Sequence, residues 1–97
     1  LKPHDVDIIL FLAPYLKLTG RYEEAIELNK RAVALDPLTR FVTLSLGLCY
    51  HEAGLFDQAI AQTEKAIDMD PASYLTYLTL AFDYADKEIN KFGNLFY

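Results

Sequence analysis

The sequence feature that most limits how this chain can fold is an internal repeat with a period of about 34 residues. When the chain is shifted by that period, its prolines, glycines and small residues coincide. The coinciding sets are Pro3, Pro37 and Pro71; Gly20 and Gly54; Ala25 and Ala59; Ala32 and Ala66; and Ala13, Gly47 and Ala81. A repeat of this length is one small structural unit that buries its apolar face against its neighbour. The chain is therefore predicted to be a stack of similar units.

Each unit reads as a pair of helices. In the clearest copy, residues 39–71, the second half places Phe56, Ile60 and Ile67 on one apolar stripe at helical spacing. The first half, residues 41–50, is apolar on almost every side, and such a helix has to be covered on more than one side. The expected helices are 6–19, 22–35, 40–53, 56–69 and 74–87.

The coinciding residues have distinct physical roles. The prolines stop one helix before the next begins. Gly20 and Gly54 supply the permissive backbone that a tight turn needs. Gly47 lets two helices approach closely. Residues that favour helix N-caps follow each proline, and they are Asp5, Thr39 and Ser73.

Three places depart from the pattern. Pro14 lies within the first expected helix, where its missing N–H predicts a kink or a late helix start. Glu88 stands where a turn glycine is expected, so residues 88–97 are predicted to be a divergent tail. The segment Leu1-Lys2-Pro3 resembles the end of a preceding unit, which indicates a parent protein that extends further at the N-terminus.

Composition narrows the classes of function. A chain of 97 residues with 53% hydrophobic and 24% charged residues is typical of one small folded domain. Its net charge of -5 disfavours binding to nucleic acids and to anionic membrane surfaces. Cys49 is the only cysteine, so no internal disulfide can form, and a reducing, cytoplasmic location is expected. No signal peptide is visible, and the apolar run 8–16 is too short to span a bilayer.

On these residues the chain resembles the tetratricopeptide repeat family over roughly 1–84. The motif residues are Leu12, Ala13, Leu16, Gly20, Tyr22, Ala25, Ala32 and Pro37 in one copy, and Leu46, Gly47, Tyr50, Gly54, Phe56, Ala59, Ala66 and Pro71 in the next. The resemblance implies an all-α fold of helix–turn–helix repeats in a short right-handed α-solenoid. The implied single domain comprises 1–3 as the end of a preceding repeat, repeats at 4–37 and 38–71, and a partial, divergent repeat at 72–97.

In this family the first helix of each pair lines a concave groove. The positions that the resemblance assigns to partner binding are Phe41, Leu44, Leu48, Glu52, Leu75, Leu78, Phe82 and Asp86. Asp7, Leu10, Pro14, Lys17, His51 and Ala85 extend the same surface. The resemblance implies a protein–protein interaction scaffold whose groove receives an apolar or amphipathic segment flanked by basic residues. The alternative is a structural, self-associating module whose groove is covered by neighbouring repeats, by the tail 92–97 or by another copy of the chain.

Other functions find little support in the residues. Some family members hold a C-terminal carboxylate with groove cations, but the corresponding positions here are Leu10, Pro14, Ser45, Leu75 and Thr79. His51 and Glu52 lack the second histidine of a zinc-protease pair, so a solvated histidine at the groove edge is expected. Asp83 and Asp86 are expected on a solvated helix face beside Glu52. No catalytic residue, metal ligand or cofactor is predicted, and the chain is not expected to be an enzyme.

Overall fold

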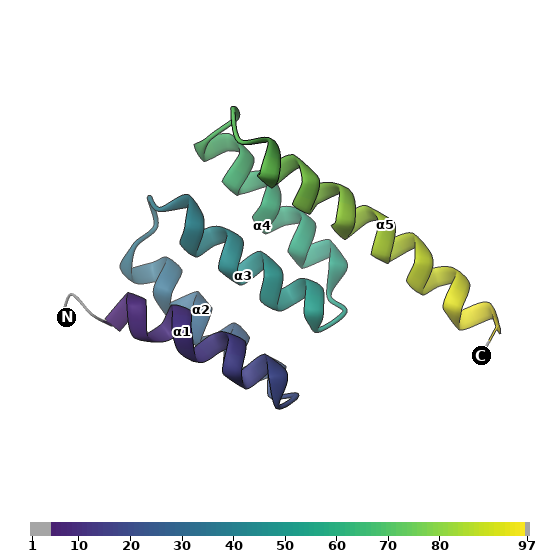
Figure 1. Cartoon of the computed structure of the whole chain (residues 1–97), viewed down its shortest axis with the longest axis horizontal. Coiled ribbons are helices and arrows are strands. Elements are labelled where there is room, and N and C mark those ends of the chain that lie inside the picture. The colour runs from purple at the N-terminus through teal and green to yellow at the C-terminus, as the bar shows by residue number, and fades with distance from the viewer. Residues whose placement is uncertain (1–4, 97) are drawn as a thin grey trace.

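The fold consists of antiparallel helix pairs arranged side by side in chain order (Figure 1). A computed structural model describes the backbone of residues 5–96 and the side chains of residues 5–92. Within that part the helices are α1 (Asp5–Leu18), α2 (Tyr22–Leu35), α3 (Arg40–Glu52), α4 (Phe56–Met69) and α5 (Tyr74–Phe96), and residues 5–96 contain no strand. The predicted all-α helical-repeat fold is confirmed. The proposed end of a preceding repeat, residues 1–3, lies outside the described residues.

The two turn glycines adopt the conformation that the repeat predicts. Gly20 and Gly54 have φ angles of 78° and 80°, where a side chain would be strained. The backbone closes in the same way at both turns. Arg21 N–H donates to the carbonyl of Leu16 at 2.8 Å, and Leu55 N–H donates to the carbonyl of Tyr50 at 2.9 Å. These bonds satisfy carbonyl groups that the end of a helix would otherwise leave free.

Small residues hold the helices close together in the core. The alanines of α2 and α4 that share the repeat register, Ala25, Ala32, Ala59 and Ala66, are completely buried. A Cβ atom built on Gly47 would lie 3.4 Å from Gln62 Cβ and 3.4 Å from the hydroxyl oxygen of Thr63. α3 and α4 therefore pack with almost no spare room at Gly47, as predicted.

Apart from shifts of one residue at the ends of α1 and α3, two features of the helices differ from the sequence prediction. α5 continues as one helix to Phe96 instead of giving way to a tail at residue 88. The physical reason is that no proline or glycine occurs between Pro71 and Gly93, so nothing stops the helix near Glu88. α1 runs through Pro14, and Asp5 is already helical, so the expected late start is wrong.

The predicted capping roles also need correction. Thr39 is the N-cap residue of α3, but its side chain makes no capping bond and donates instead to Asp36 Oδ2 at 2.7 Å. Ser73 precedes α5, and its hydroxyl oxygen accepts a bond of 3.3 Å from Arg40. These side chains join neighbouring segments and do not simply satisfy the first turn of their own helices.

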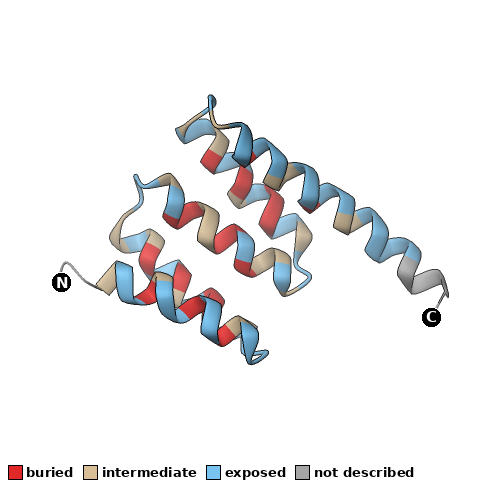
Figure 2. Cartoon of the chain, viewed as in Figure 1, coloured by how far each residue is buried: buried red, intermediate tan, exposed pale blue. Residues whose placement is uncertain are grey.

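Burial is uneven along the chain (Figure 2). Buried positions recur on each of the helices α1 to α4, whereas α5 is exposed along most of its described length. Among residues 5–96, none of the helices combines the length and the hydropathy that crossing a membrane requires.

Candidate functional site

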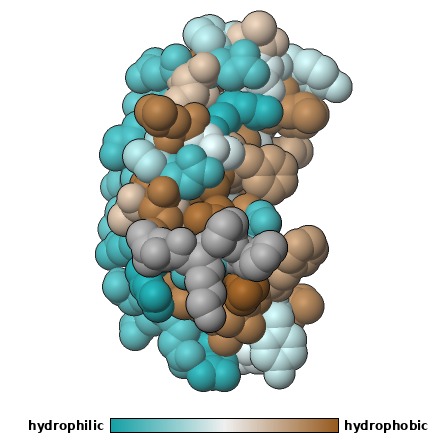
Figure 3. Space-filling model, turned by 90° about the vertical axis from the view of Figure 1, so that its left-hand side faces the viewer, coloured by the Kyte–Doolittle hydropathy of each residue, from teal (hydrophilic) through white to brown (hydrophobic). Residues whose placement is uncertain are grey.

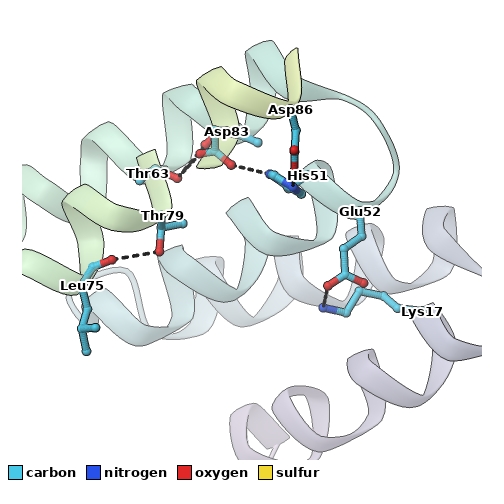
Figure 4. A network of polar contacts seen from close by, with 9 residues as sticks. Lys17, His51, Glu52, Thr63, Leu75, Thr79, Asp83 and Asp86 are labelled. Atoms are coloured by element: carbon cyan, nitrogen blue, oxygen red, sulfur yellow. Dashed lines mark hydrogen bonds and ion pairs between the residues drawn. The ribbon is translucent and has the colours of Figure 1, made fainter. Parts of the chain in front are cut away.

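The candidate site lies on the layer formed by the first helix of each pair. Side-chain bonds join these helices in order: Lys17 Nζ of α1 lies 3.2 Å from Glu52 Oε1 of α3. His51 of α3 contacts two aspartates of α5, Asp83 and Asp86. α1, α3 and α5 therefore present one continuous surface, which we call the inner face (Figure 4).

The apolar residues predicted for the groove are largely exposed on the inner face. The exposed fractions are 65% for Phe41, 42% for Leu48, 58% for Leu75, 46% for Leu78 and 56% for Phe82, while Leu44 is half-buried. In Figure 3 one side of the molecule is mainly hydrophilic and the opposite side is hollowed and flanked by hydrophobic residues. No segment among the described residues covers the exposed side chains.

A pocket of about 330 Å³ brings four of the predicted residues together. Leu48 and Glu52 of α3 line it with Phe82 and Asp86 of α5, and His51, Thr79 and Asp83 complete its walls. Phe41, Leu44, Leu75 and Leu78 do not line this pocket. The inner face is therefore one mixed apolar and acidic pocket with further apolar side chains nearer the start of α3 and α5.

The acidic groups of the pocket are paired within the chain. Glu52, whose side chain is 46% exposed, forms its ion pair with Lys17. Asp86, also 46% exposed, lies with its Oδ2 atom 2.7 Å from His51 Nε2. A basic partner would therefore have to compete with Lys17 and His51 for these carboxylates.

Asp83 and His51 are placed differently from the prediction. Asp83 is completely buried and is not part of a solvated helix face. The His51 side chain is only 19% exposed, and its Nδ1 atom lies 2.6 Å from Asp83 Oδ1. The ring also packs edge-on against Phe56, with centroids 5.3 Å apart. The expectation of a solvated histidine is wrong because α5 places an aspartate within hydrogen-bonding distance of each ring nitrogen.

The geometry gives His51 a structural role. Its two ring nitrogens lie 2.6 Å from Asp83 Oδ1 and 2.7 Å from Asp86 Oδ2, so the ring bridges two positions one turn apart on α5. The second oxygen of Asp83 accepts a hydrogen bond of 2.8 Å from the Thr63 hydroxyl of α4 (Figure 4). This polar cluster of His51, Thr63, Asp83 and Asp86 joins α5 to α3 and α4 and holds the walls of the pocket in place.

The repeat register contained a signal for the burial of Asp83. Cys49 occupies the same position one repeat earlier and is also buried. An aspartate at a position that packs inward needs hydrogen-bonding partners. Thr63, whose position is in register with buried Asn29, supplies one of the hydrogen-bonding partners of Asp83.

A second hollow, of about 480 Å³, lies away from the inner face. It surrounds the α1–α2 turn and is lined by Gly20, Arg21, Tyr22, Glu23, Glu24, Ile26, Ala53 and Leu55. Arg21 and Glu24 form an exposed ion pair within this region, which raises the pKa of the Arg21 guanidinium through the hydrogen bond to Glu24. Exposed pairs of this kind contribute little to stability or binding, so the inner face is the stronger candidate.

Within the described residues, no three His, Cys, Asp or Glu side chains form a metal-binding arrangement.

In a comparison with known protein families, one part of the chain finds a match. Residues 44–73 match the family model for the tetratricopeptide repeat. The match runs from within α3 through α4 to the residue before α5. No curated protein matches the sequence.

Proposed function

Because residues 44–73 match the tetratricopeptide repeat family and the helix pairs repeat on either side of them, we propose that the inner face of this chain is a docking site for a segment of another protein. Repeats of this family are generally protein–protein interaction modules, and the family is typically non-enzymatic. The proposal goes further: it assigns the docking to Phe41, Leu44, Leu48, Leu75, Leu78 and Phe82, with Glu52 and Asp86 at the edge.

The observation that carries the proposal is the exposure of these apolar side chains. Phe41, Leu75 and Phe82 are each more than half exposed. Six large side chains at ~100 Å² each form a patch of several hundred Å², which is at the upper limit of what monomers normally leave uncovered. Covering that patch releases on the order of 10 kcal/mol before the costs of association are subtracted.

The chemistry of the pocket favours an amphipathic segment. Leu48 and Phe82 would contact its apolar side chains, because both line the pocket and both are exposed. Glu52 and Asp86 lie at the same pocket and would favour lysine or arginine beside the apolar residues. Lys17 and His51 already hold those carboxylates, so we expect the basic residues to set orientation more than affinity.

The alternative in which the chain's own tail covers the inner face is not favoured. Residues 88–96 continue α5 as a helix, and Figure 1 shows this end of α5 extending beyond α4. The alternatives that remain are that neighbouring repeats cover the groove or that a second copy of the chain fills it. The second-copy alternative predicts a dimer that is lost when a groove residue such as Phe82 becomes charged.

The proposal is tested by selecting peptides from a random phage-displayed library against the immobilised chain. Affinities of the selected peptides are then measured by fluorescence anisotropy for the wild type and for Phe82→Glu and Leu48→Glu. Ala61→Glu is the matched control, because Ala61 is exposed on α4, outside the inner face. We expect peptides with apolar and basic residues that bind at least about tenfold more weakly to the two groove variants.

Two results would contradict the docking site. Peptides that bind Phe82→Glu and Leu48→Glu as tightly as the wild type would place recognition elsewhere. Failure to select any peptide would argue that the inner face does not receive short segments. Far-UV circular dichroism of each variant checks that a loss of affinity does not reflect unfolding, and both residues are exposed enough to tolerate a carboxylate.

A further inference from the structure

The inner face carries two matching rows of side chains, one on α3 and one on α5. Each row has three apolar residues followed by an acidic residue: Phe41, Leu44, Leu48 and Glu52 on α3, and Leu75, Leu78, Phe82 and Asp86 on α5. Each residue of the second row lies one repeat after its counterpart in the first row. α1 breaks the pattern, because its residues at these positions are Asp7, Leu10, Pro14 and Leu18.

We call the space between these two rows the trough, and side chains of α3 span it at both ends. Near the start of α3, Arg40 Nη1 donates to Thr76 Oγ1 of α5 at 3.1 Å. Near the end of α3, the two ring nitrogens of His51 contact Asp83 and Asp86 (Figure 4). α3 and α5 therefore run alongside each other, with the two rows on either side of the trough.

The exposed row on α3 belongs to a helix that has neighbours on both sides. α3 packs against α1, α2 and α4 and is bonded to α5 through His51. Phe41 is nevertheless 65% exposed and Leu48 42% exposed. The exposure of the α3 row therefore does not depend on which helix comes last.

We propose that the trough binds an amphipathic α-helix of another protein, about three turns long, with a basic residue of that helix beside Glu52 and Asp86. The inference rests on the proposed docking function of the inner face and specifies the conformation and position of the docked segment. From its first to its last residue, each row rises about 16 Å along its own helix, which is the length of about three turns.

The polar groups of the trough favour a helix over an extended segment. A helix satisfies most of its backbone N–H and C=O groups internally, whereas an extended backbone needs partners for them. The polar side chains at the pocket already have partners within the chain. They are Thr79, bonded to the Leu75 carbonyl; Asp83 and Asp86, bonded to His51; and Glu52, paired with Lys17 (Figure 4). An extended backbone in the trough would therefore lose hydrogen bonds to water and regain few of them.

The spacing of the apolar side chains favours the same conformation. Successive members of a row are three or four residues apart, which is about 4.5–6 Å along the helix axis. A bound helix presents its own apolar stripe at the same steps, so the two sets of side chains can interdigitate. An extended segment presents a side chain on one face every ~6.6 Å and falls out of step with the rows.

Charge favours another protein over a second copy as the occupant. Glu52 and Asp86 end both rows at the same end of the trough, so a basic residue is attracted there. A second copy brings its own net charge of -5, which opposes association. Lys17, the basic residue in the last turn of α1, is already paired with Glu52. A basic amphipathic segment of another protein meets neither obstacle.

The test compares two phage-displayed peptide libraries of equal amino-acid composition, each selected against the immobilised chain. In the first library, large apolar residues recur at every third or fourth position, with a basic residue one step beyond each end. In the second library, the same residues alternate with polar ones, as on one face of a strand. We expect the first library to yield peptides that bind Phe82→Glu at least about tenfold more weakly than the wild type. Ala61→Glu, on the exposed side of α4, should bind them like the wild type.

The conformation of the bound peptides is measured directly. Helices this short are marginal in water, so mixing peptide and chain should increase the helical circular dichroism beyond the sum of the two separate spectra. Proline at the centre of a selected peptide should weaken binding at least about 30-fold, because it breaks the helix. Alanine at the same position, on the polar side of the peptide, should change the affinity by less than about threefold.

The position of the basic residue is tested with Glu52→Gln. This variant should bind the selected peptides at least about threefold more weakly, but should bind like the wild type when glutamine replaces the basic residues of the peptide. Glu64→Gln is the matched control, because it removes an exposed carboxylate of α4. Equal losses for the two kinds of peptide would overturn the placement of the basic residue beside Glu52.

The docking function and the helical conformation can fail separately. If only the alternating library yields peptides, and these lose affinity for Phe82→Glu, the helix proposal is overturned and the docking site stands. If neither library yields a peptide, both proposals fail. A wild-type chain that sediments as a dimer and becomes a monomer in Phe82→Glu would assign the trough to a second copy and overturn the proposal.

Discussion

The hydroxyl of Thr63 donates a hydrogen bond of 2.8 Å to Asp83 Oδ2, and both side chains are completely buried between α4 and α5. The same two positions meet one repeat earlier, where the Asn29 amide donates to Cys49 Sγ at 3.2 Å between α2 and α3. In both repeats, the second helix of one pair therefore contacts the first helix of the next pair at the same two positions. The side chains that make the contact differ. In the later copy it buries a carboxylate.

Removing that carboxylate should destabilise the fold. Asp83→Ala leaves the Thr63 hydroxyl without its α5 partner and removes one of the two carboxylates around His51. We expect a loss of about 2–4 kcal/mol in the free energy of unfolding, measured by urea denaturation. Asp86→Ala is the matched control: its side chain is 46% exposed, so its loss should cost under about 1 kcal/mol. Equal effects of the two substitutions would contradict the structural role of Asp83.

The parts of the structure that follow the repeat could be predicted from the sequence. Gly20 and Gly54 predict the two tight turns, because the backbone there has a positive φ angle that favours glycine. Gly47 predicts the close approach of α3 and α4, because a side chain at that position would crowd α4. The length of α5 does not follow from the repeat: the repeat register predicts a turn at Glu88, whereas the local sequence has no residue that stops a helix there.

The polar cluster around His51 was missed for a different reason. Its members come from α3, α4 and α5, and their meeting depends on how the helices pack in three dimensions. Apolar periodicity says which face of a helix is buried. It does not say which polar side chains on neighbouring helices meet, so Asp83 was expected on a solvated surface.

Gly47 provides a graded test of the packing between α3 and α4. A Cβ atom there would lie 3.4 Å from Thr63 Oγ1 and 3.6 Å from the Ala59 carbonyl, which is tight but allowed. Gly47→Ala should therefore be close to neutral, since a gain in helix propensity of up to about 1 kcal/mol offsets the crowding. Gly47→Leu should destabilise by about 1–3 kcal/mol through overpacking. Thermal denaturation of both variants checks this order, and a tolerated leucine would mean that the helices are farther apart.

Cys49 should be an unreactive thiol in the folded protein. Burial raises the pKa of the Cys49 thiol above its ordinary value, and the Asn29 amide lies against the sulfur. Because the thiolate is the reactive species, little of it forms near neutral pH. We expect labelling by a disulfide reagent to be slower by about a hundredfold or more than in urea-unfolded protein, where access and thiolate fraction are both restored. Rapid labelling under native conditions would show that α3 opens readily from α2.

The ion pair between Asp57 and Lys87 should give α5 an acid-sensitive contact with α4. Lys87 Nζ lies 2.7 Å from Asp57 Oδ1, and the hydrogen bond from Lys87 holds the pKa of Asp57 below its ordinary value of 3.8. A group whose pKa is lowered by folding stabilises the fold above its unfolded pKa and loses that contribution as the pH falls through the folded pKa. Wild type should therefore lose more stability below pH 3.8 than Asp57→Asn, as measured by urea midpoints across that range. High salt should shrink the difference, because both side chains are near the surface. Identical pH profiles for the two proteins would mean that the pair does not form in solution.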